Sequence, residues 1–396
     1  MPRSTAHDFD LHGFVGVRLL NASESDRRAV RRQLGPLESP LGRDPDIVIR
    51  FVERLRITAP LRLLGVDEAG FTDDAFLVLR SRRKTAARVR IPFEEIGGRC
   101  EILCESGLSA VPLLVPIINL TALAKGFVPL HASAFTYRGT GVVSTGWSKG
   151  GKTEMLLAFL NRGAEYVGDE WVYLSPDGRQ VYGIPEPVRV WDWHLRQLAD
   201  LRARIGVRTR LRLRGLELCR SLSERLASLG AHRRGAGIWT RVAALLRKQA
   251  HVDVPSEVLT GNARGPRSAT FDRLLFVISG ESPEVTVEPI DPAEVARRMV
   301  HSLEYERSAL LGYYRMFRFA SPERSNPLLE QAEPLGRELL ERALAGKPAS
   351  AVCHPYPVQF SDLFDCVAPL LVPPAIPALD WPVPSEPLRV LEASQA

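Results

Sequence analysis

Cysteine is scarce in this chain, and the few thiols present do not follow the spacing of a disulfide framework or a zinc site. The 396 residues contain Cys100, Cys104, Cys219, Cys353 and Cys366. Their number is odd, no two have the CxxC spacing, and no histidine stands at zinc-ligand spacing from them. We therefore expect reduced thiols, which excludes a small disulfide-stapled fold and a cysteine-based zinc centre.

Long apolar runs are also missing. The first ten residues, MPRSTAHDFD, lack the apolar segment of a secretory signal. The most apolar stretch, residues 110–124, is interrupted by Pro112 and Pro116 and is too short to span a bilayer comfortably. We therefore expect a cytoplasmic protein with no membrane segment.

Aromatic residues are few where basic residues are densest. Between Arg196 and Lys248, thirteen arginines and one lysine face three acidic residues, and Trp239 is the only aromatic side chain. Nucleic-acid surfaces combine cations with aromatic platforms, so this composition disfavours a nucleic-acid partner. The leucines have helical spacing, which predicts a helical insertion over residues 195–260. Its arginines form either the solvated face of an amphipathic hairpin or a cradle for an acidic peptide, an acidic partner or a phosphorylated product.

The most informative stretch fits the phosphate-binding pattern G-x-x-x-x-G-K-[ST]. Its residues are Gly146, Trp147, Ser148, Lys149, Gly150, Gly151, Lys152 and Thr153. In this pattern the backbone amides surround the phosphates, the lysine reaches the β and γ groups, and the hydroxyl holds Mg²⁺. The β-branched run 141–145 before the loop predicts a strand, and the run 153–160 after it predicts a helix. The sequence therefore predicts a nucleotide site that uses ATP and Mg²⁺.

Two further segments are expected beside this loop. A strand at residues 165–167 after the helix predicts a βαβ unit and leads into Asp169 and Glu170, which can hold the metal or accept a proton. Upstream, a strand that contains His131 is joined to the loop strand by a hairpin turn at residues 138–141. We therefore expect His131 to face the same phosphates.

These residues together resemble the HPr kinase/phosphorylase superfamily, including its peptide and small-molecule kinases, and more distantly ATP-dependent phosphoenolpyruvate carboxykinase. The shared order is L-H-x-S-A, a turn and strand, G-x-S-x-G-G-K-T, about sixteen residues, then G-D-[DE]. The close resemblance covers residues 128–173, with a looser likeness over about 110–355. It implies a P-loop kinase core that transfers the γ-phosphate of ATP to a hydroxyl acceptor on a peptide, a protein or a small molecule.

The resemblance also implies roles for single residues. His131 matches the active-site histidine, Asp169 the base that activates the acceptor hydroxyl, and Glu170 the second acid, on the metal side with Thr153. Lys152 holds the transferred phosphate. HPr kinase has two aspartates and an arginine where this chain has Asp169, Glu170 and Trp171, and the chain lacks its P-G-R-N stretch. These departures disfavour HPr as the substrate and disfavour the reverse phosphorolysis.

Two other functional interpretations stay open. A nucleotide-gated binding protein would use ATP to order the arginine-rich insertion without phosphoryl transfer. A bifunctional HPr kinase/phosphorylase is the second alternative. The resemblance is also compatible with a homo-oligomer.

The whole chain is expected to belong to the α/β class. Residues 1–105 form an N-terminal α/β unit with a helix at residues 23–34, and residues 106–355 form the kinase core that contains the helical insertion. A helix over residues 111–125 should cross the core sheet just before His131. Residues 356–396 form a C-terminal helix and a proline-rich tail.

Overall fold

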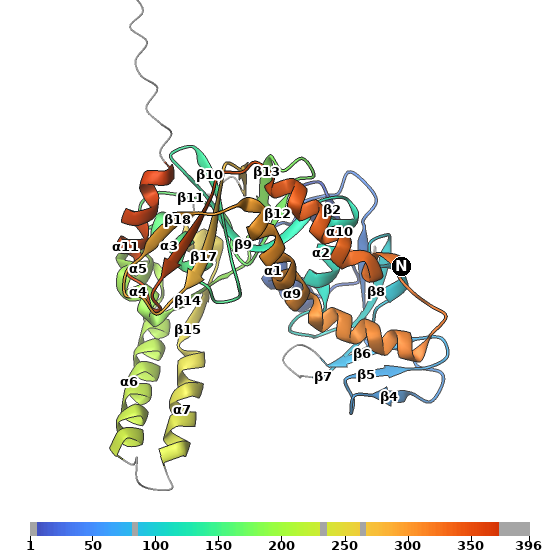
Figure 1. The fold of residues 1–396 in the computed structure, drawn as a ribbon. Coiled ribbons are helices and arrows are strands. Elements are labelled where there is room, and N and C mark those ends of the chain that lie inside the picture. Colours follow the sequence, from blue (N-terminus) through green and yellow to red (C-terminus); the bar gives the residue numbers. More distant parts are fainter. Residues whose placement is uncertain (1–5, 81–85, 230–235, 262–266, 372–396) are drawn as a thin grey trace, which may run out of the picture.

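The computed structural model describes residues 6–80, 86–229, 236–261 and 267–371. It confirms the α/β class, because helices pack on two large sheets that each contain parallel and antiparallel strands (Figure 1). None of the helices in these ranges is long and apolar enough to cross a membrane. The proline-rich tail predicted at the C-terminus lies outside the described residues.

The first sheet contains eight strands from the N-terminal part of the chain. They are β1 (His7–Leu11), β2 (Val15–Leu20), β3 (Ile47–Val52), β4 (Arg62–Leu64), β5 (Ala69–Phe71), β6 (Phe76–Arg80), β7 (Ala86–Arg90) and β8 (Cys100–Glu105). Their order in the sheet is β1-β2-β3-β8-β7-β6-β5-β4, with β2, β3 and β8 parallel. Helix α1 (Glu24–Leu34) joins β2 to β3 and begins at Ser23, which forms a capping box with Asp26.

The second sheet contains nine strands and carries the predicted loop. They are β9 (Val128–Tyr137), β10 (Thr140–Thr145), β11 (Glu165–Gly168), β12 (Trp171–Leu174), β13 (Gln180–Gly183), β16 (Ser268–Thr270), β17 (Arg273–Ser279), β18 (Thr286–Pro289) and β19 (Ala349–His354). The main order is β16-β13-β12-β9-β10-β17-β19-β18, and β11 also pairs with β9. The parallel strands β10, β17 and β19 end at the same edge.

The predicted βαβ unit needs a correction. Helix α3 (Lys152–Leu160) does connect β10 to β11, as expected. However, β10 and β11 are both antiparallel to β9, which lies between them. The two strands therefore run parallel without being neighbours, because the predicted hairpin inserts β9 into the crossover.

Helices cover both faces of the second sheet. Helices α2 (Leu114–Ala124), α9 (Pro292–Ala320) and α10 (Pro327–Leu344) contact β9 from one face. Helix α3 covers the other face, where α11 (Phe360–Val367) packs on it and the 3₁₀ turn η2 (Ala368–Leu371) follows. A short 3₁₀ turn, η1 (Phe93–Glu95), precedes β8.

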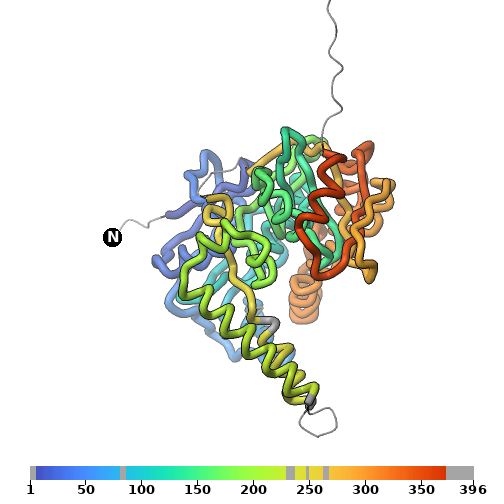
Figure 2. The backbone as a smooth tube through the Cα atoms, turned by 90° about the vertical axis from the view of Figure 1, so that its left-hand side faces the viewer, coloured from blue at the N-terminus to red at the C-terminus, as the bar shows by residue number. Residues whose placement is uncertain are grey.

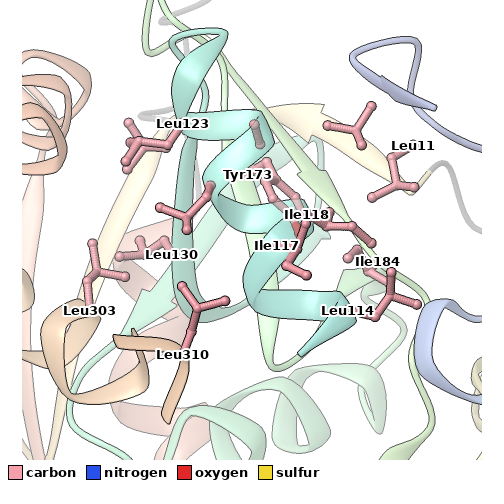
Figure 3. Close-up of a cluster of buried hydrophobic side chains, with 14 of the residues drawn as sticks. Leu11, Leu114, Ile117, Ile118, Leu123, Leu130, Tyr173, Ile184, Leu303 and Leu310 are labelled. Carbon is pink, nitrogen blue, oxygen red and sulfur yellow. The ribbon is translucent and has the colours of Figure 1, made fainter. Parts of the chain in front are cut away.

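Helix α2 lies inside the largest hydrophobic core and confirms the helix predicted at residues 111–125. Its side chains meet Leu11 of β1, Leu130 of β9 and Leu303 of α9 in one buried cluster (Figure 3). The helix is apolar on nearly all sides because it is covered from both sheets. Helix α2 buries two polar side chains, and both are hydrogen-bonded: Asn119 Oδ1 accepts from the Tyr173 hydroxyl at 2.7 Å, and the Thr121 hydroxyl donates to Ile117 O at 2.9 Å.

The predicted helical insertion is largely present. It contains α4 (Asp192–Gln197), α5 (Ala199–Arg204), α6 (Val207–Leu229), α7 (Ala236–Gln249) and α8 (Ser256–Leu259). A two-stranded ribbon of β14 (Val188–Trp191) and β15 (His251–Val254) connects it to the core; the prediction missed β15. Helices α6 and α7 form a hairpin that projects away from the rest of the molecule (Figures 1 and 2).

Candidate functional site

The candidate site forms around His131 on the central strand β9. On one side, β9 pairs with β10, with Ala132 opposite Thr145, the last residue before the glycine-rich loop. On the other side it pairs with β12, with His131 opposite Trp171. The loop and the acidic pair therefore approach His131 from opposite neighbours of one strand.

A tight turn at Glu170 makes the side chains of Asp169 and Glu170 point in different directions. Glu170 has a positive φ of 65°, and Trp171 N donates to Asp169 O at 2.8 Å across it, which is the geometry of a strained γ-turn. The turn interrupts the nearly continuous edge formed by β11 and β12. As a result, Asp169 points to helix α3 while Glu170 points to His131.

The loop depends on two glycines that tolerate close backbone approach. A Cβ at Gly146 would lie 2.3 Å from the carbonyl oxygen of Val277 on β17. Gly151 has a φ of 105°, and a Cβ there would lie 1.9 Å from His354 Nε2. These contacts allow the loop to wrap tightly before α3, whose first amides point toward the space that the loop encloses.

Lys152 and Thr153 open helix α3 at the end of this loop. The buried Lys152 Nζ donates to the carbonyl oxygens of Trp147 at 2.9 Å and Gly146 at 3.3 Å. Burial lowers the pKa of Lys152, while the surrounding carboxylates oppose this shift. The Thr153 hydroxyl donates to Asp169 Oδ2 at 3.1 Å, so the loop and the acidic turn are in direct contact.

Asp169 is buried in a position that favours its protonated form. Its side chain has only 2% of its surface exposed. Burial, followed by the charge of Glu170, raises the pKa of Asp169 to about 7, although the Thr153 hydrogen bond and the Lys152 charge oppose this rise. A carboxyl group with a pKa near neutrality is suited to exchange a proton with a substrate at physiological pH.

His131 lies between two carboxylates. Its Nε2 is 3.1 Å from Glu170 Oε2, and its Nδ1 is 2.9 Å from Glu306 Oε1 on α9. Burial alone would lower the pKa of His131, but the contacts with Glu170 and Glu306 outweigh burial and raise it. The hydrogen bond from His131 lowers the pKa of the half-exposed Glu170. The pair therefore favours an imidazolium beside an ionised carboxylate.

The other predicted loop residues, Trp147, Ser148 and Lys149, lie at or near the protein surface. Trp147 is exposed and packs against Tyr305 of α9, with ring centroids 5.2 Å apart. Ser148 is half-buried and Lys149 is exposed. Lys149 also has a positive φ of 64°, so it shapes the turn of the loop.

Three residues of the site were not predicted from the sequence. Glu306 lies in the middle of α9, far from any motif, and only the fold brings it to His131. His354 Nε2 lies 3.0 Å from Gly150 O. Because β19 is parallel to β17 and β17 to β10, a strand prediction at residues 351–354 could have placed His354 at the loop edge. The third residue, Glu186, has a buried Oε1 without a hydrogen-bond partner in the described ranges.

The electrostatic environment connects Glu186 to the acidic turn. Burial, together with the charges of Glu170 and Asp169, raises the pKa of Glu186 well above its usual range. The hydroxyl of Tyr166 is likewise buried without a hydrogen-bond partner among the residues described, and burial and the Asp169 charge raise its pKa. Glu186 is thus a buried carboxyl group that favours its protonated form and that no motif reveals.

The residues present fit a Mg²⁺-nucleotide better than a metal held by protein alone. Within the ranges that the structure describes, no three or more His, Cys, Asp or Glu side chains are grouped to hold a metal ion. Mg²⁺ in nucleotide sites needs only one or two protein oxygens, because phosphates and water complete its shell. The Thr153 hydroxyl and the Glu170 carboxylate can supply such oxygens, although the turn directs Asp169 to Thr153 and Glu170 to His131.

Comparisons with known proteins do not identify a family. A scan against protein-family models and a search of curated proteins each found no match to this chain.

Proposed function

We propose that this protein is a P-loop kinase of the HPr kinase-like type, which transfers the γ-phosphate of ATP to a hydroxyl acceptor. The observation that carries the proposal is the meeting of a glycine-rich loop, a buried carboxyl group and a histidine around one strand. Thr153 joins the loop to Asp169 at 3.1 Å, and Glu170 joins the same turn to His131 at 3.1 Å.

The loop residues would bind and orient the nucleotide. The amides at the start of α3 would receive the phosphates, and Lys152 would leave its two carbonyl partners to neutralise the β and γ groups. Thr153 and Glu170 would hold Mg²⁺, which supplies neutralisation of phosphate charge when bound.

The acidic turn and His131 would act on the acceptor. Asp169 would accept the proton of the acceptor hydroxyl while the hydroxyl oxygen forms the new bond to phosphorus. The bond to the ADP oxygen then breaks, and its electron pair leaves with ADP. His131, as an imidazolium held by Glu170 and Glu306, would stabilise negative charge on the transferring group.

Two measurements test this proposal. Purified protein incubated with labelled ATP and candidate peptides or metabolites should transfer label to a hydroxyl, and Asp169→Asn should reduce transfer by about 10²–10⁴-fold. ATP should raise the melting temperature of the wild type but not of Lys152→Ala. Equal transfer by Asp169→Asn would remove the proposed base, and equal ATP protection of Lys152→Ala would contradict the loop assignment.

A nucleotide-gated binding protein is favoured by a separate contact. Glu154 on α3 lies 3.2 Å from His194 on α4, so the loop helix is bonded directly to the helical insertion. ATP protection without label transfer to any hydroxyl tested would support this second function.

A further inference from the structure

The hairpin of α6 and α7 has little of its own surface buried. Within its described side chains, only Leu213, Ser223 and Ala243 are buried. The two helices contact each other and extend away from the body of the protein, while Leu213 packs with Leu195 of α4 and Leu201 of α5 (Figures 1 and 2). Most of the hairpin surface is therefore available to a partner.

Exposed apolar side chains recur along one side of α6. We define the α6 face as Val207, Leu211, Leu218, Leu222 and Leu226, whose relative exposures are 60%, 60%, 72%, 60% and 36%. Successive members are four or seven residues apart, so they align along one side of the helix. At about 100° per residue this side points away from the two buried positions of α6, Leu213 and Ser223. The α6 face is thus unpartnered within the described fold, and it is too large to be scattered single exposures.

Arginines border this face and few carboxylates balance them. Helix α6 carries six arginines and two glutamates, and α7 carries two arginines, one lysine and no acidic residue. Both glutamates, Glu217 and Glu224, already pair with Arg220. The hairpin as a whole therefore presents a strong excess of positive charge next to apolar surface.

A hollow lies at the base of the hairpin, between the start of α6 and strand β15. It has a volume of about 460 Å³ and is lined by Arg208, Thr209, Arg212, His251, Val252 and Asp253. Asp253 pairs with Arg189 on the adjacent strand β14. Helix α4 follows β14, and its His194 Nε2 lies 3.2 Å from Glu154 Oε1 on α3, so the base of the insertion contacts the helix that begins with Lys152.

These observations favour one type of occupant. A second copy of this chain would bring one arginine-bordered face against another and would be repelled. A flat anionic membrane could cover the α6 face but would leave the hollow at the base of the hairpin unfilled. An amphipathic helix with leucines and carboxylates would cover the apolar residues and offer each flanking arginine a partner.

We propose that the α6 face and the hollow at its base bind an acidic amphipathic helix of a partner protein. We further assign this partner as the phosphoryl acceptor, a step that rests on the proposed kinase function. The apolar face provides the contact area, and the hollow, with Arg208 and Arg212 in its lining, receives a carboxylate at the base of the hairpin.

Binding is tested with the full chain and a synthetic probe, without nucleotide. The probe is a fluorescein-labelled peptide with leucine and glutamate in a heptad repeat, and its control replaces each glutamate with lysine. The acidic peptide should bind, and Leu218→Ser with Leu222→Ser should weaken it by about tenfold or more. Arg208→Gln with Arg212→Gln should weaken it and reduce the salt dependence of binding. The matched control is Leu63→Ser, which removes an equally exposed leucine on β4.

Several outcomes would overturn the docking proposal. These are equal binding of the lysine peptide, unchanged affinity in the α6 variants, or an equal loss in Leu63→Ser. A dimer in light scattering that Leu218→Ser with Leu222→Ser dissociates would instead assign the face to a second copy. Binding only to vesicles that contain phosphatidylglycerol would assign it to a membrane.

The acceptor role has its own readout. With serine residues added to the acidic peptide, the α6 double variant should raise KM about tenfold and leave kcat unchanged. An unchanged KM would overturn the acceptor role. Failure of the kinase proposal is detected separately. It appears as an absence of ATP protection in the wild type, and that result leaves the measured binding of the labelled peptide unchanged.

Discussion

His131 Nε2 lies 3.1 Å from Glu170 Oε2, and this contact crosses from the central strand β9 to a strained turn on its neighbour. Glu170 reaches the imidazole because its left-handed backbone turns it away from Asp169. The same turn therefore separates two acids that are adjacent in sequence: Glu170 lies beside His131, which lowers the pKa of its carboxyl group, while Asp169 is buried against Thr153 and its pKa is raised. This separation gives one acid the properties of a charge partner and the other those of a proton acceptor.

Replacing Glu170 with glutamine should lower the pKa of His131. The substitution removes a negative charge that favours the imidazolium. Burial, which disfavours the imidazolium, then has a larger effect on the pKa of His131. The titration midpoint of the His131 ring proton in NMR spectra should move to lower pH. Glu306→Gln should move it in the same direction, whereas Glu304→Gln, beside the exposed His301, should leave it in place. A midpoint that rises in Glu170→Gln would contradict the assigned ion pair.

Phosphoryl transfer should depend on the ionisation of Asp169. Because the pKa of Asp169 is raised to about 7, the residue is largely protonated below that pH and cannot accept a proton. The value of kcat/KM should therefore rise with pH and level off above about 7. Asp169→Asn should have low activity with no such rise. A wild-type profile that falls as the pH increases through 7 would exclude Asp169 as the base.

The same residue should reduce the stability of the folded protein at neutral pH. Its pKa is about 7 when folded against an ordinary 3.8, so between these values the native state binds more protons than the unfolded state. Stability is then lost as the pH rises through this window, by up to about 4 kcal/mol for a shift of about three units. Asp169→Asn avoids this loss and keeps an acceptor for the Thr153 hydroxyl.

Denaturation at several pH values measures this effect. The free energy of unfolding of Asp169→Asn should differ little from that of the wild type below pH 4 and should exceed it increasingly up to pH 8. Asp73→Asn, at a highly exposed position, serves as the control and should show no such growth. If the difference in the free energy of unfolding between Asp169→Asn and the wild type is constant with pH, the pKa of Asp169 is not raised in the folded protein.

The fold and the site differ in how much of them the sequence could predict. Local signals sufficed for the strand, loop and helix around Gly151, because glycine positions and apolar periodicity are properties of neighbouring residues. The position of β9 between β10 and β11 could not be obtained this way, since two parallel strands joined by a helix fit either arrangement. Pairing of β9 with both neighbours is decided by long-range contacts alone.

Side chains far along the chain were the hardest to predict. Glu306 is one of many charged residues on α9, and nothing in its local pattern separates it from Glu304, which faces solvent beside His301. By contrast, Arg298 pairs with Glu294 on the exposed side of the same helix. Which face of a long helix meets a site depends on how the helix packs across the sheet, and this depends on the whole core.

Gly151→Ala should abolish ATP binding through a steric clash. The added Cβ would lie 1.9 Å from His354 Nε2, and the φ of 105° is itself unfavourable for alanine. At a hundredfold excess over the wild-type Kd, ATP should stabilise the wild type by about 2.7 kcal/mol and this variant by close to zero.

Gly163→Ala separates the clash from backbone strain. Gly163 also has a positive φ, of 86°, but nothing lies within 4 Å of the position of its Cβ. This variant should lose some stability and retain ATP protection. Full ATP protection in Gly151→Ala would mean that the loop and His354 are not held together as described.

The buried pair of Glu154 and His194 should couple the loop helix to the helical insertion. His194 Nδ1 accepts from the Trp191 amide at 3.2 Å, so its Nε2 carries the proton that is donated to Glu154. Burial would raise the pKa of Glu154, but this hydrogen bond outweighs burial and lowers it.

A double-mutant cycle of Glu154→Ala and His194→Ala should give a coupling energy of about 1–3 kcal/mol at pH 7, because either single change leaves a buried polar group unpaired. Because the pKa of Glu154 is lowered, the coupling should persist into acidic pH and weaken only where Glu154 becomes protonated, and the exposed pair of Glu294 and Arg298 should give only about 0.3–0.5 kcal/mol. Equal coupling in the two pairs would mean that α4 is not fastened to α3 through this contact.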